Sequence, residues 1–209
     1  MILHGYFRST ASWRVRIALG LKGLEAVQVS HHLRKGEHRL PAFLALNPQG
    51  LLPALETDDG QVLTQSLAII EYLDEFLPEP ALLPRNSVQK AKVRAVAQIV
   101  ACDIHPVQNL KVLQGLRDLG HSEDQVQKWA ARTIEDGLDA VEKLIADQPG
   151  PFAFGDKPTL ADICIVPQLG NARRFGVELR WPRIQALEEA CLQLEAFKAA
   201  VPSAQPDAE

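Results

Sequence analysis

The stretch FRSTASWRVRIAL, from Phe7 to Leu19, joins a segment rich in small hydroxyl side chains to a helix with an apolar face. The N-terminus of a helix has free backbone N–H groups and partial positive charge, so it favours bound anions. Hydroxyl side chains at that point either cap the helix or contact such an anion. Taken alone, the stretch fits both a simple capped helix and an anion site, and the rest of the chain must decide between them.

The composition is that of an ordinary folded protein, with 46% hydrophobic and 23% charged residues among 209. A chain of this length holds one large domain or two small ones. The net charge of −4 leaves no basic surplus to neutralise phosphates, so we expect no nucleic-acid partner. No apolar run approaches the ~18 residues of a membrane span, and the N-terminus lacks the basic region of a secretory signal. We therefore expect a cytoplasmic protein that does not enter a membrane.

The cysteines are Cys102, Cys164 and Cys191, an odd number with wide spacing. They form neither a CxxC pair nor a disulfide framework, which is typical of a reducing compartment. We expect all three to be buried small hydrophobic residues, and we expect no metal site.

Residues 1–80 alternate short strand-like and helix-like segments. We expect strands at 2–6, at 26–30 and on both sides of the Asp58-Asp59-Gly60 turn, and helices at 12–22, 40–45 and 66–76. The order β-α-β-α-β-β-α predicts a small α/β domain with a mixed sheet.

A proline-rich segment, LPEPALLPRN at 77–86, then indicates a domain linker. Beyond it the pattern is helical only, and we expect one all-helical domain over 87–209. Its helices are predicted at 87–115, at 123–146, from a capping-box spacing of Thr159 and Asp162 onward, and at 183–200. The tail at 202–209 is expected to be frayed.

This arrangement resembles the cytosolic glutathione S-transferases over essentially the whole chain. RSTASWRVRIAL resembles the zeta-class signature, usually written SSCxWRVRIAL, and ALNPQGLLPAL resembles the segment that ends in the family's cis-proline. QSLAIIEYL, DIHPVQNLKVL and VPQLGNARRF resemble three further family segments. The resemblance implies a thioredoxin-like N-terminal domain with a mixed four-stranded sheet, an all-helical C-terminal domain, glutathione as cofactor, and a homodimer.

The activity implied by the resemblance is glutathione-dependent cis-trans isomerisation of a maleyl dioxo acid, which is a dicarboxylate. A longer and a shorter maleyl acid both stay open as the substrate. A transferase of broader specificity, for example one that dehalogenates small α-halo acids, and a non-catalytic module with the transferase fold also stay open.

The resemblance places the glutathione thiolate at the start of the first helix. Ser9 matches the family's first serine, Thr10 stands for the second, and Ala11 replaces the family cysteine, so the nucleophile must come from glutathione. Ser9, Thr10 and Arg8 are thus the expected catalytic residues. Leu52, before Pro53, would pair its backbone with the extended peptide. Gln65 and Ser66 precede an apolar helix whose N-terminus can receive a carboxylate.

The remaining site residues follow the same family pattern. Arg8, Lys111 and Arg174 are expected to hold the substrate's carboxylates. Arg173 is expected to be a solvated neighbour of Arg174, and His105 and Asn109 are expected on one helical face. The full set of expected cofactor contacts is Ser9, Thr10, Ala11, Ser12, Trp13, Arg14, His38, Gln49, Leu52, Pro53, Gln65, Ser66, His105, Asn109, Leu110 and Lys111.

Overall fold

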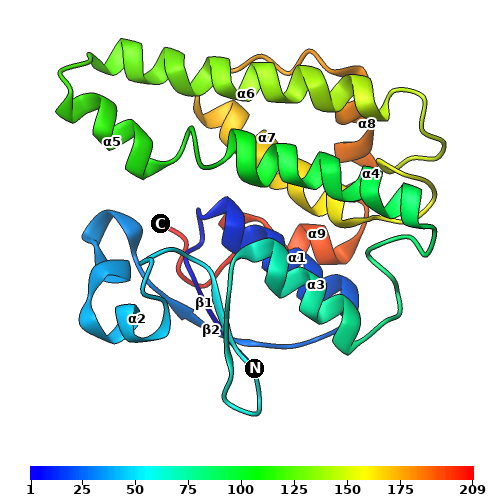
Figure 1. The fold of residues 1–209 in the computed structure, drawn as a ribbon, viewed down its shortest axis with the longest axis horizontal. Helices are drawn as coiled ribbons and strands as arrows, with labels where there is room; N and C mark the ends of the chain where they lie inside the picture. The colour runs from blue at the N-terminus through cyan, green and yellow to red at the C-terminus, as the bar shows by residue number, and fades with distance from the viewer. The chain divides into compact units, whose positions relative to one another are not determined.

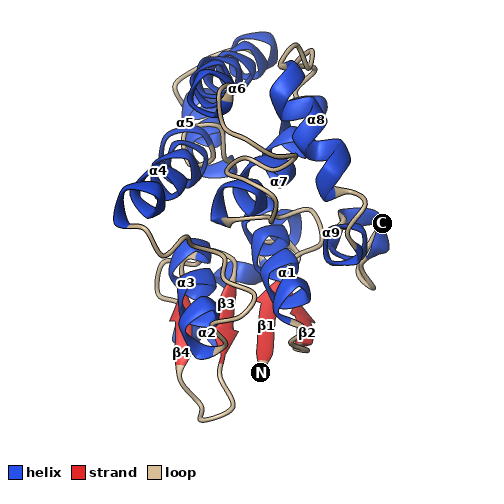
Figure 2. Cartoon of the chain, turned by 90° about the vertical axis from the view of Figure 1, so that its right-hand side faces the viewer, coloured by secondary structure: helices blue, strands red, loops and turns tan.

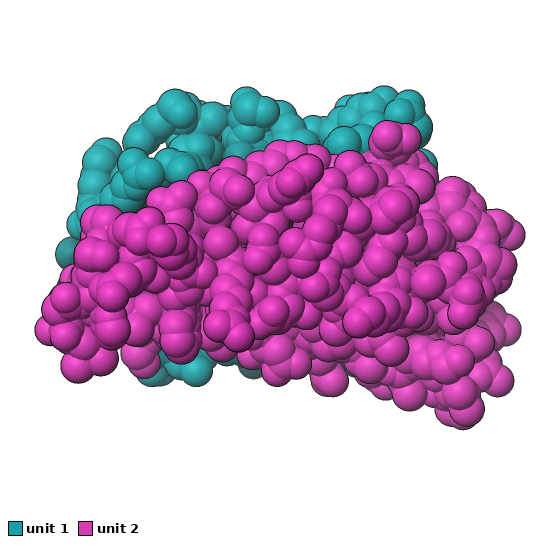
Figure 3. Space-filling view, turned by 90° about the horizontal axis from the view of Figure 1, so that it is seen from above, with its two compact units in different colours: residues 1–82, 192–209 teal, residues 83–191 magenta.

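A computed structural model describes residues 1–209, and the chain divides into two compact units (Figures 1 and 3). Unit 1 comprises Met1–Leu82 together with Leu192–Glu209, and unit 2 comprises Leu83–Cys191. The division after Leu82 falls inside the proline-rich segment. The last residues, Leu192–Glu209, lie with unit 1, which differs from the expected single helical domain over 87–209.

Unit 1 has the predicted order β-α-β-α-β-β-α, followed by a C-terminal addition. Its strands are β1 (Ile2–Gly5), β2 (Val27–Ser30), β3 (Ala54–Glu56) and β4 (Val62–Thr64). Its α-helices are α1 (Thr10–Lys22), α2 (Pro41–Leu46), α3 (Ser66–Phe76) and α9 (Glu195–Ala200). Three short 3₁₀ helices complete it: η1 (Leu33–Lys35), η2 (Glu37–Arg39) and η4 (Pro202–Ala204).

The four strands form one mixed sheet in the order β2-β1-β3-β4 (Figure 2). β1 runs parallel to β2, with Ile2 opposite Val27, and the other two pairs are antiparallel. Parallel neighbours need a crossover, which α1 supplies, whereas β3 and β4 need only the tight turn that ends at Gly60. The mixed four-stranded sheet is as predicted.

Alternate residues of β1 point to opposite faces of the sheet. A Cβ on Gly5 would lie 3.3 Å from Ser12, so this position faces α1. The ring of His4 points the other way, and its centroid is 6.3 Å from that of Phe43 in α2. The helices α1 and α2 thus cover different faces.

Unit 2 is helical throughout. Its elements are α4 (Ser87–Gln98), the π-helical segment η3 (Ile99–Ile104), α5 (Leu110–Asp118), α6 (Glu123–Ile145), α7 (Leu160–Arg174) and α8 (Pro182–Cys191). Every residue of α7 from Leu160 to Leu169 is buried, as expected for a helix that is surrounded by others. α4 and α8 pack against α7, and α6 packs against η3 and α5.

The single helix predicted over 87–115 is wrong. The chain passes through η3 into a turn, and α5 starts anew at Leu110 with Asn109 as its cap. Pro106 explains the break, because proline has no N–H to donate and its ring clashes with the preceding turn.

The helix predicted over 183–200 is also divided, into α8 and α9. α9 packs against α1 instead of extending α8, and a Cβ on Gly20 of α1 would lie only 3.0 Å from that of Ala196. Burial of Phe197 and Ala200 against unit 1 outweighs the propensity to continue one helix.

Three further expectations have clear outcomes. The capping box is confirmed, because Asp162 accepts the N–H of Thr159 at 2.7 Å. Cys164 and Cys191 are buried as predicted, but Cys102 is exposed, since it lies on the outer side of η3. No helix is both long and apolar enough to cross a membrane.

Candidate active site

Ser9 is the N-cap of α1. Its Oγ accepts the N–H of Ser12 at 3.2 Å, and its own N–H donates to the carbonyl oxygen of Tyr6 at 3.0 Å. The cap uses only the oxygen of the hydroxyl group, so the hydroxyl hydrogen is left to donate to an anion. Arg8 is half-buried beside it, and no hydrogen bond or ion pair within the chain uses its guanidinium group.

The residues after Ser9 lie largely inside unit 1. Thr10 and Ala11 are 5% and 7% exposed, and Trp13 is 8% exposed, so these positions contribute more to the core than to a surface. Ser12 is fully buried next to Gly5, and its Oγ has no hydrogen-bond partner. An unpaired buried hydroxyl is uncommon, and this one lies in the first turn of α1.

Arg14 links α1 to the start of α3. It is 1% exposed, and its Nη1 donates to the Oγ of Ser66 at 3.4 Å. The first backbone bond of α3 runs from Ile69 to the carbonyl oxygen of Gln65, so the N–H groups of the first turn are not used by the helix. Free N–H groups next to a buried guanidinium make this helix terminus a favourable position for a carboxylate.

Gln65 has φ 69°, the one positive φ at a residue other than glycine. Left-handed backbone at such a residue costs on the order of 1–3 kcal/mol and occurs mainly at functional sites. Its Nε2 donates to the Oε1 of Gln49 at 2.9 Å. The structure therefore brings these two predicted residues together at the N-terminus of α3.

The segment before β3 is held by a residue that the sequence analysis missed. Asn47 is 2% exposed, donates to the carbonyl oxygen of Leu51 at 2.7 Å and accepts the N–H of Gln49 at 3.1 Å. The turn signal Asn-Pro-Gln-Gly would have indicated this role. The Leu52–Pro53 bond is cis, as predicted, and neither backbone polar group of Leu52 is bonded within the chain.

His38 lies on η2 next to this segment, since a Cβ on Gly50 would be 3.2 Å from the carbonyl oxygen of His38. Its Nδ1 is buried without a partner. Burial, with a smaller contribution from Arg39, lowers the pKa of His38. A neutral imidazole with an unpaired nitrogen can accept or donate one further hydrogen bond.

The candidates in unit 2 are arranged differently from the expectation. His105 follows η3 and Asn109 caps α5, so they do not share one helical face. Leu110 and Lys111 lie exposed in the first turn of α5. The break at Pro106 separates His105 from the helix that carries these residues.

Arg174 is exposed at the end of α7, and its guanidinium lies 4.8 Å from the ring centroid of Phe175. Arg173 was expected to be only a solvated neighbour, but it forms a bidentate ion pair with Glu188, with distances of 2.7 and 2.5 Å. Hydrogen bonding to Glu188 raises the pKa of Arg173. The side chain of Arg173 therefore joins α7 to α8.

No group of three or more histidine, cysteine or carboxylate side chains is arranged to hold a metal ion. The groups assembled on unit 1 instead suit an extended molecule with anionic ends. They are a hydroxyl donor at α1, the unbonded backbone N–H and C=O groups of Leu52 before β3, and a cationic helix terminus at α3.

Models of the N-terminal and C-terminal domains of glutathione S-transferases match residues 8–75 and 108–190. Together with the mixed sheet and the helical unit, these matches establish that the chain belongs to the glutathione S-transferase family.

Several similar proteins are isomerases. A maleylacetoacetate isomerase from Pseudomonas aeruginosa is 52% identical over 99% of this chain and 98% of its own length. The structure of a maleylpyruvate isomerase, a bacterial zeta-class glutathione S-transferase, is 48% identical with a TM-score of 0.97 and covers 100% of both chains. Maleylacetoacetate isomerase from Anaeromyxobacter dehalogenans, solved with glutathione in its active site, is 44% identical with a TM-score of 0.90 over 99% of this chain and 97% of that one.

Proposed function

We propose that this protein is a glutathione-dependent cis-trans isomerase that converts maleylacetoacetate to fumarylacetoacetate, a step of tyrosine and phenylalanine catabolism. The observation that carries the proposal is the set of unused hydrogen-bonding groups on unit 1. Glutathione has matching groups: a thiol, an extended peptide backbone and two carboxylates. The family relatives with bound glutathione support the same cofactor here.

The residues present fit that cofactor. The Ser9 hydroxyl would donate to the thiolate, and the N–H and C=O groups of Leu52 would pair with the peptide. The N-terminus of α3, with Ser66 backed by Arg14, would hold the γ-glutamyl carboxylate. His38 and Gln49 would contact the glycyl end, His38 through its unpaired Nδ1.

Bound glutathione supplies a thiol nucleophile, whose reversible addition to the conjugated double bond makes rotation about that bond possible. Ser9 would favour the ionised thiol by hydrogen bonding to it. Ala11 has no thiol, so no protein sulfur acts at this position. Arg8 would stabilise negative charge that develops on the substrate, and Lys111 and Arg174 would hold its carboxylates.

Maleylpyruvate is the second candidate substrate, favoured by the likeness to the maleylpyruvate isomerase structure. The two acids share the conjugated dioxo group and both carboxylates, and they differ in length. The cations named above would suit either of them.

The test is a steady-state assay of the purified chain on both maleyl acids, with and without glutathione. We expect turnover that requires glutathione without consuming it, and a higher kcat/KM for maleylacetoacetate. A higher kcat/KM for maleylpyruvate would assign the second substrate. Absence of turnover on both acids, with glutathione still bound, would favour a broader transferase or a non-catalytic module.

We also propose that the protein is a cytoplasmic homodimer, as the family resemblance implies. Sedimentation velocity should then give a mass of twice 23.0 kDa at micromolar concentration. A single species of 23.0 kDa would contradict this assignment.

A further inference from the structure

The C-terminal segment Gln205–Glu209, which we call the C-terminal clasp, is bonded to unit 1 along its length. The expectation of a frayed tail is therefore wrong. Gln205 is 6% exposed, donates to the carbonyl oxygens of Ala199 and Val201 at 2.8 and 2.9 Å, and accepts from Gln28 of β2 at 3.2 Å. Buried amide bonds of this kind fix the direction in which the last residues leave η4.

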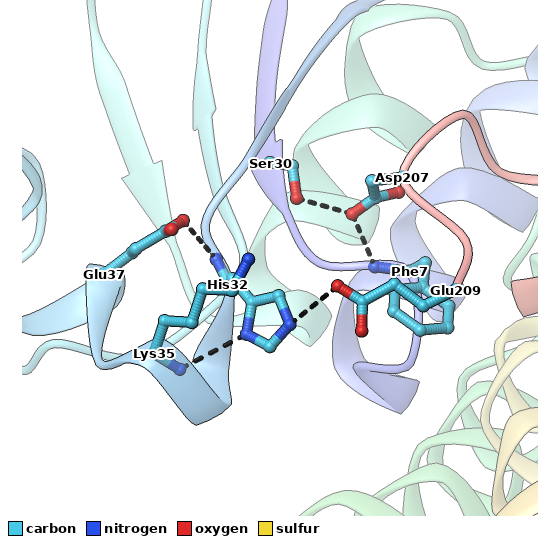
Figure 4. Close-up of polar contacts among 7 residues, drawn as sticks. All are labelled: Phe7, Ser30, His32, Lys35, Glu37, Asp207 and Glu209. Carbon is cyan, nitrogen blue, oxygen red and sulfur yellow. Dashed lines mark hydrogen bonds and ion pairs between the residues drawn. The ribbon is translucent and has the colours of Figure 1, made fainter.

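Asp207 bonds directly to the loop that precedes α1 (Figure 4). Its Oδ2 accepts the N–H of Phe7 at 3.1 Å and the hydroxyl of Ser30 at 2.5 Å. The carbonyl oxygen of Phe7 accepts from Nη2 of the buried Arg16 at 3.0 Å. The backbone is thus held on both sides of Phe7, directly before Arg8 and Ser9.

Arg16 strengthens this arrangement electrostatically. Its Nε donates to the carbonyl oxygen of Ala200 at 3.1 Å, so the same side chain holds α9 and the loop. Burial lowers the pKa of Arg16 to about 10, and the negative charge of Asp207 opposes that effect. The carboxylate therefore has a charge partner as well as two hydrogen-bond donors.

Glu209 attaches the end of the clasp to η1. Its Oε1 lies 3.0 Å from Nε2 of His32, whose Nδ1 accepts the N–H of Lys35 (Figure 4). Because Nδ1 accepts, the ring proton of neutral His32 lies on Nε2, which donates to Glu209. The imidazole centroid is 4.9 Å from that of Tyr6, so this contact supports the residue before Phe7.

We propose that Asp207 is a positioning residue for the Phe7–Ser9 loop, and that the C-terminal clasp is thereby part of the support of the active site. Phe7 is only 6% exposed, so removal of the carboxylate would leave its N–H without a partner. The loop would then shift to hydrate this group, and the Ser9 hydroxyl would move with it. This inference rests on the proposed function, in which Ser9 stabilises the thiolate of glutathione.

The experiment measures kcat on the maleyl acid, the pKa of enzyme-bound glutathione from its thiolate absorbance, and the melting temperature. Asp207→Ala should lower kcat about tenfold and raise the pKa of the glutathione thiol, because the displaced Ser9 hydroxyl would no longer donate its hydrogen bond to the thiolate. Ser30→Ala should act in the same direction more weakly, and should add nothing in the Asp207→Ala background. Asp147→Ala, which removes an exposed and unbonded carboxylate, is the charge-matched control and should match the unmodified chain.

An Asp207→Ala variant with a lower melting temperature but an unchanged kcat and thiol pKa would overturn the inference, since Asp207 would then serve only to anchor the tail. Should that variant fail to fold, Asp207→Asn and Ser30→Ala decide the question by the same two readouts. The role of Ser9 is tested separately by its own substitutions. Normal activity there, with a loss at Asp207, would retain the positioning role and contradict only the role of Ser9.

Discussion

Ser9 serves the fold through its oxygen and is proposed to serve the reaction through its hydrogen. The oxygen accepts the N–H of Ser12, and this cap contributes about 1 kcal/mol to the stability of α1. Substitutions that keep an acceptor but remove the donor can therefore separate the two roles.

Ser9→Asp should keep the helix cap and the melting temperature, because a carboxylate is also a good cap. It should lose turnover by at least about ten- to a hundredfold, since it cannot donate to a thiolate and repels it. Ser9→Ala should lose turnover to a similar extent and should also melt earlier. Steady-state kinetics, calorimetric glutathione binding and thermal melting check these expectations.

Thr10→Ala is the matched control for Ser9. Thr10 is 5% exposed, so its hydroxyl is less accessible to a ligand than that of the half-buried Ser9. We expect a smaller loss of turnover at Thr10. A larger loss there than at Ser9 would transfer the thiolate contact to Thr10.

His31 belongs to a chain of polar groups on the α2 face of the sheet. Its Nε2 is 2.9 Å from Nδ1 of His4, and Nε2 of His4 is 2.5 Å from the carboxylate of Glu56. The His4–His31 bond requires that one of the rings be neutral. Burial first, and then the charges of His4 and His38, lower the pKa of His31, while Glu37 opposes them.

The folded protein should therefore lose stability in mildly acidic solution. The pKa of His31 is lower in the folded state than its ordinary value of 6.5, so the unfolded state binds more protons below that pH. The part of the folding stability that depends on neutral His31 is fully present above about pH 6.5 and is lost as the pH falls through the lower pKa of the folded state. Melting temperatures should drop on acidification, and His31→Gln should make the pH dependence shallower. His121→Gln, at an exposed site in unit 2, should leave the pH dependence unchanged.

At the scale of the elements, short sequence motifs correctly predicted the helix starts and turns that depend only on neighbouring residues. The hydroxyl-rich start of α1, the Asp-Gly turn and the Thr159–Asp162 capping box each formed at their predicted positions. Proline at 106 was visible in the sequence, but amphipathic spacing on both sides suggested one continuous helix. The break at Pro106 and the new start of α5 at Leu110, capped by Asn109, are local features that the spacing of apolar residues alone does not report.

The C-terminal residues show the opposite case. Nothing in PSAQPDAE indicates order, because its short polar side chains have weak intrinsic preferences. Order comes from partners distant in sequence, such as Phe7 and Ser30 for Asp207. In the candidate site, the cis bond before Pro53 was predicted from resemblance, and the Asn-Pro-Gln-Gly turn could have indicated the role of Asn47. The positive φ of Gln65 has no such local signal, because left-handed backbone there depends on the surrounding fold.

Gly137 fixes the packing of α6 on η3. A Cβ at this position would lie 2.3 and 2.4 Å from Cγ1 and Cδ1 of Ile104, which is itself only 1% exposed, so one of the two groups must shift within the core. Gly137→Ala should therefore destabilise the protein by about 1–3 kcal/mol, in spite of the better helix propensity of alanine. Urea unfolding measures the difference.

The control for Gly137 is Gly115, in the interior of α5, where a Cβ would meet nothing within 4 Å. Gly115→Ala should raise the free energy of unfolding by up to about 1 kcal/mol, because alanine has the better helix propensity. Equal gains at both glycines would mean that Ile104 moves aside readily, and that the contact between η3 and α6 is loose.

At the scale of the whole molecule, the proposed glutathione contacts on α1, α3 and the segment before β3 all belong to unit 1. Two of the cations proposed for the substrate, Lys111 and Arg174, belong to unit 2. Four further expected glutathione contacts, His105, Asn109, Leu110 and Lys111, also lie in unit 2, so Arg174, which is expected to contact only the substrate, gives the cleaner test. A change at Arg174 should alter the kinetics of the maleyl acid and leave glutathione affinity unchanged. Its neighbour Arg173 supplies a control on the same helix.

Arg174→Ala should mainly raise KM for the maleyl acid. Loss of a charge-assisted pair with a carboxylate predicts a penalty of about 2–3 kcal/mol in kcat/KM, a factor of roughly thirty or more. Arg174→Lys should rescue only part of it, since a point charge replaces a planar group with paired donors. Calorimetric glutathione affinity, measured without substrate, should hardly change.

Arg173→Ala removes the ion pair to Glu188 and should lower the melting temperature while leaving KM near its original value. A collapse of glutathione affinity in Arg174→Ala at constant KM would instead assign Arg174 to the cofactor or to the fold, and Arg8 and Lys111 would then have to bind the substrate's carboxylates.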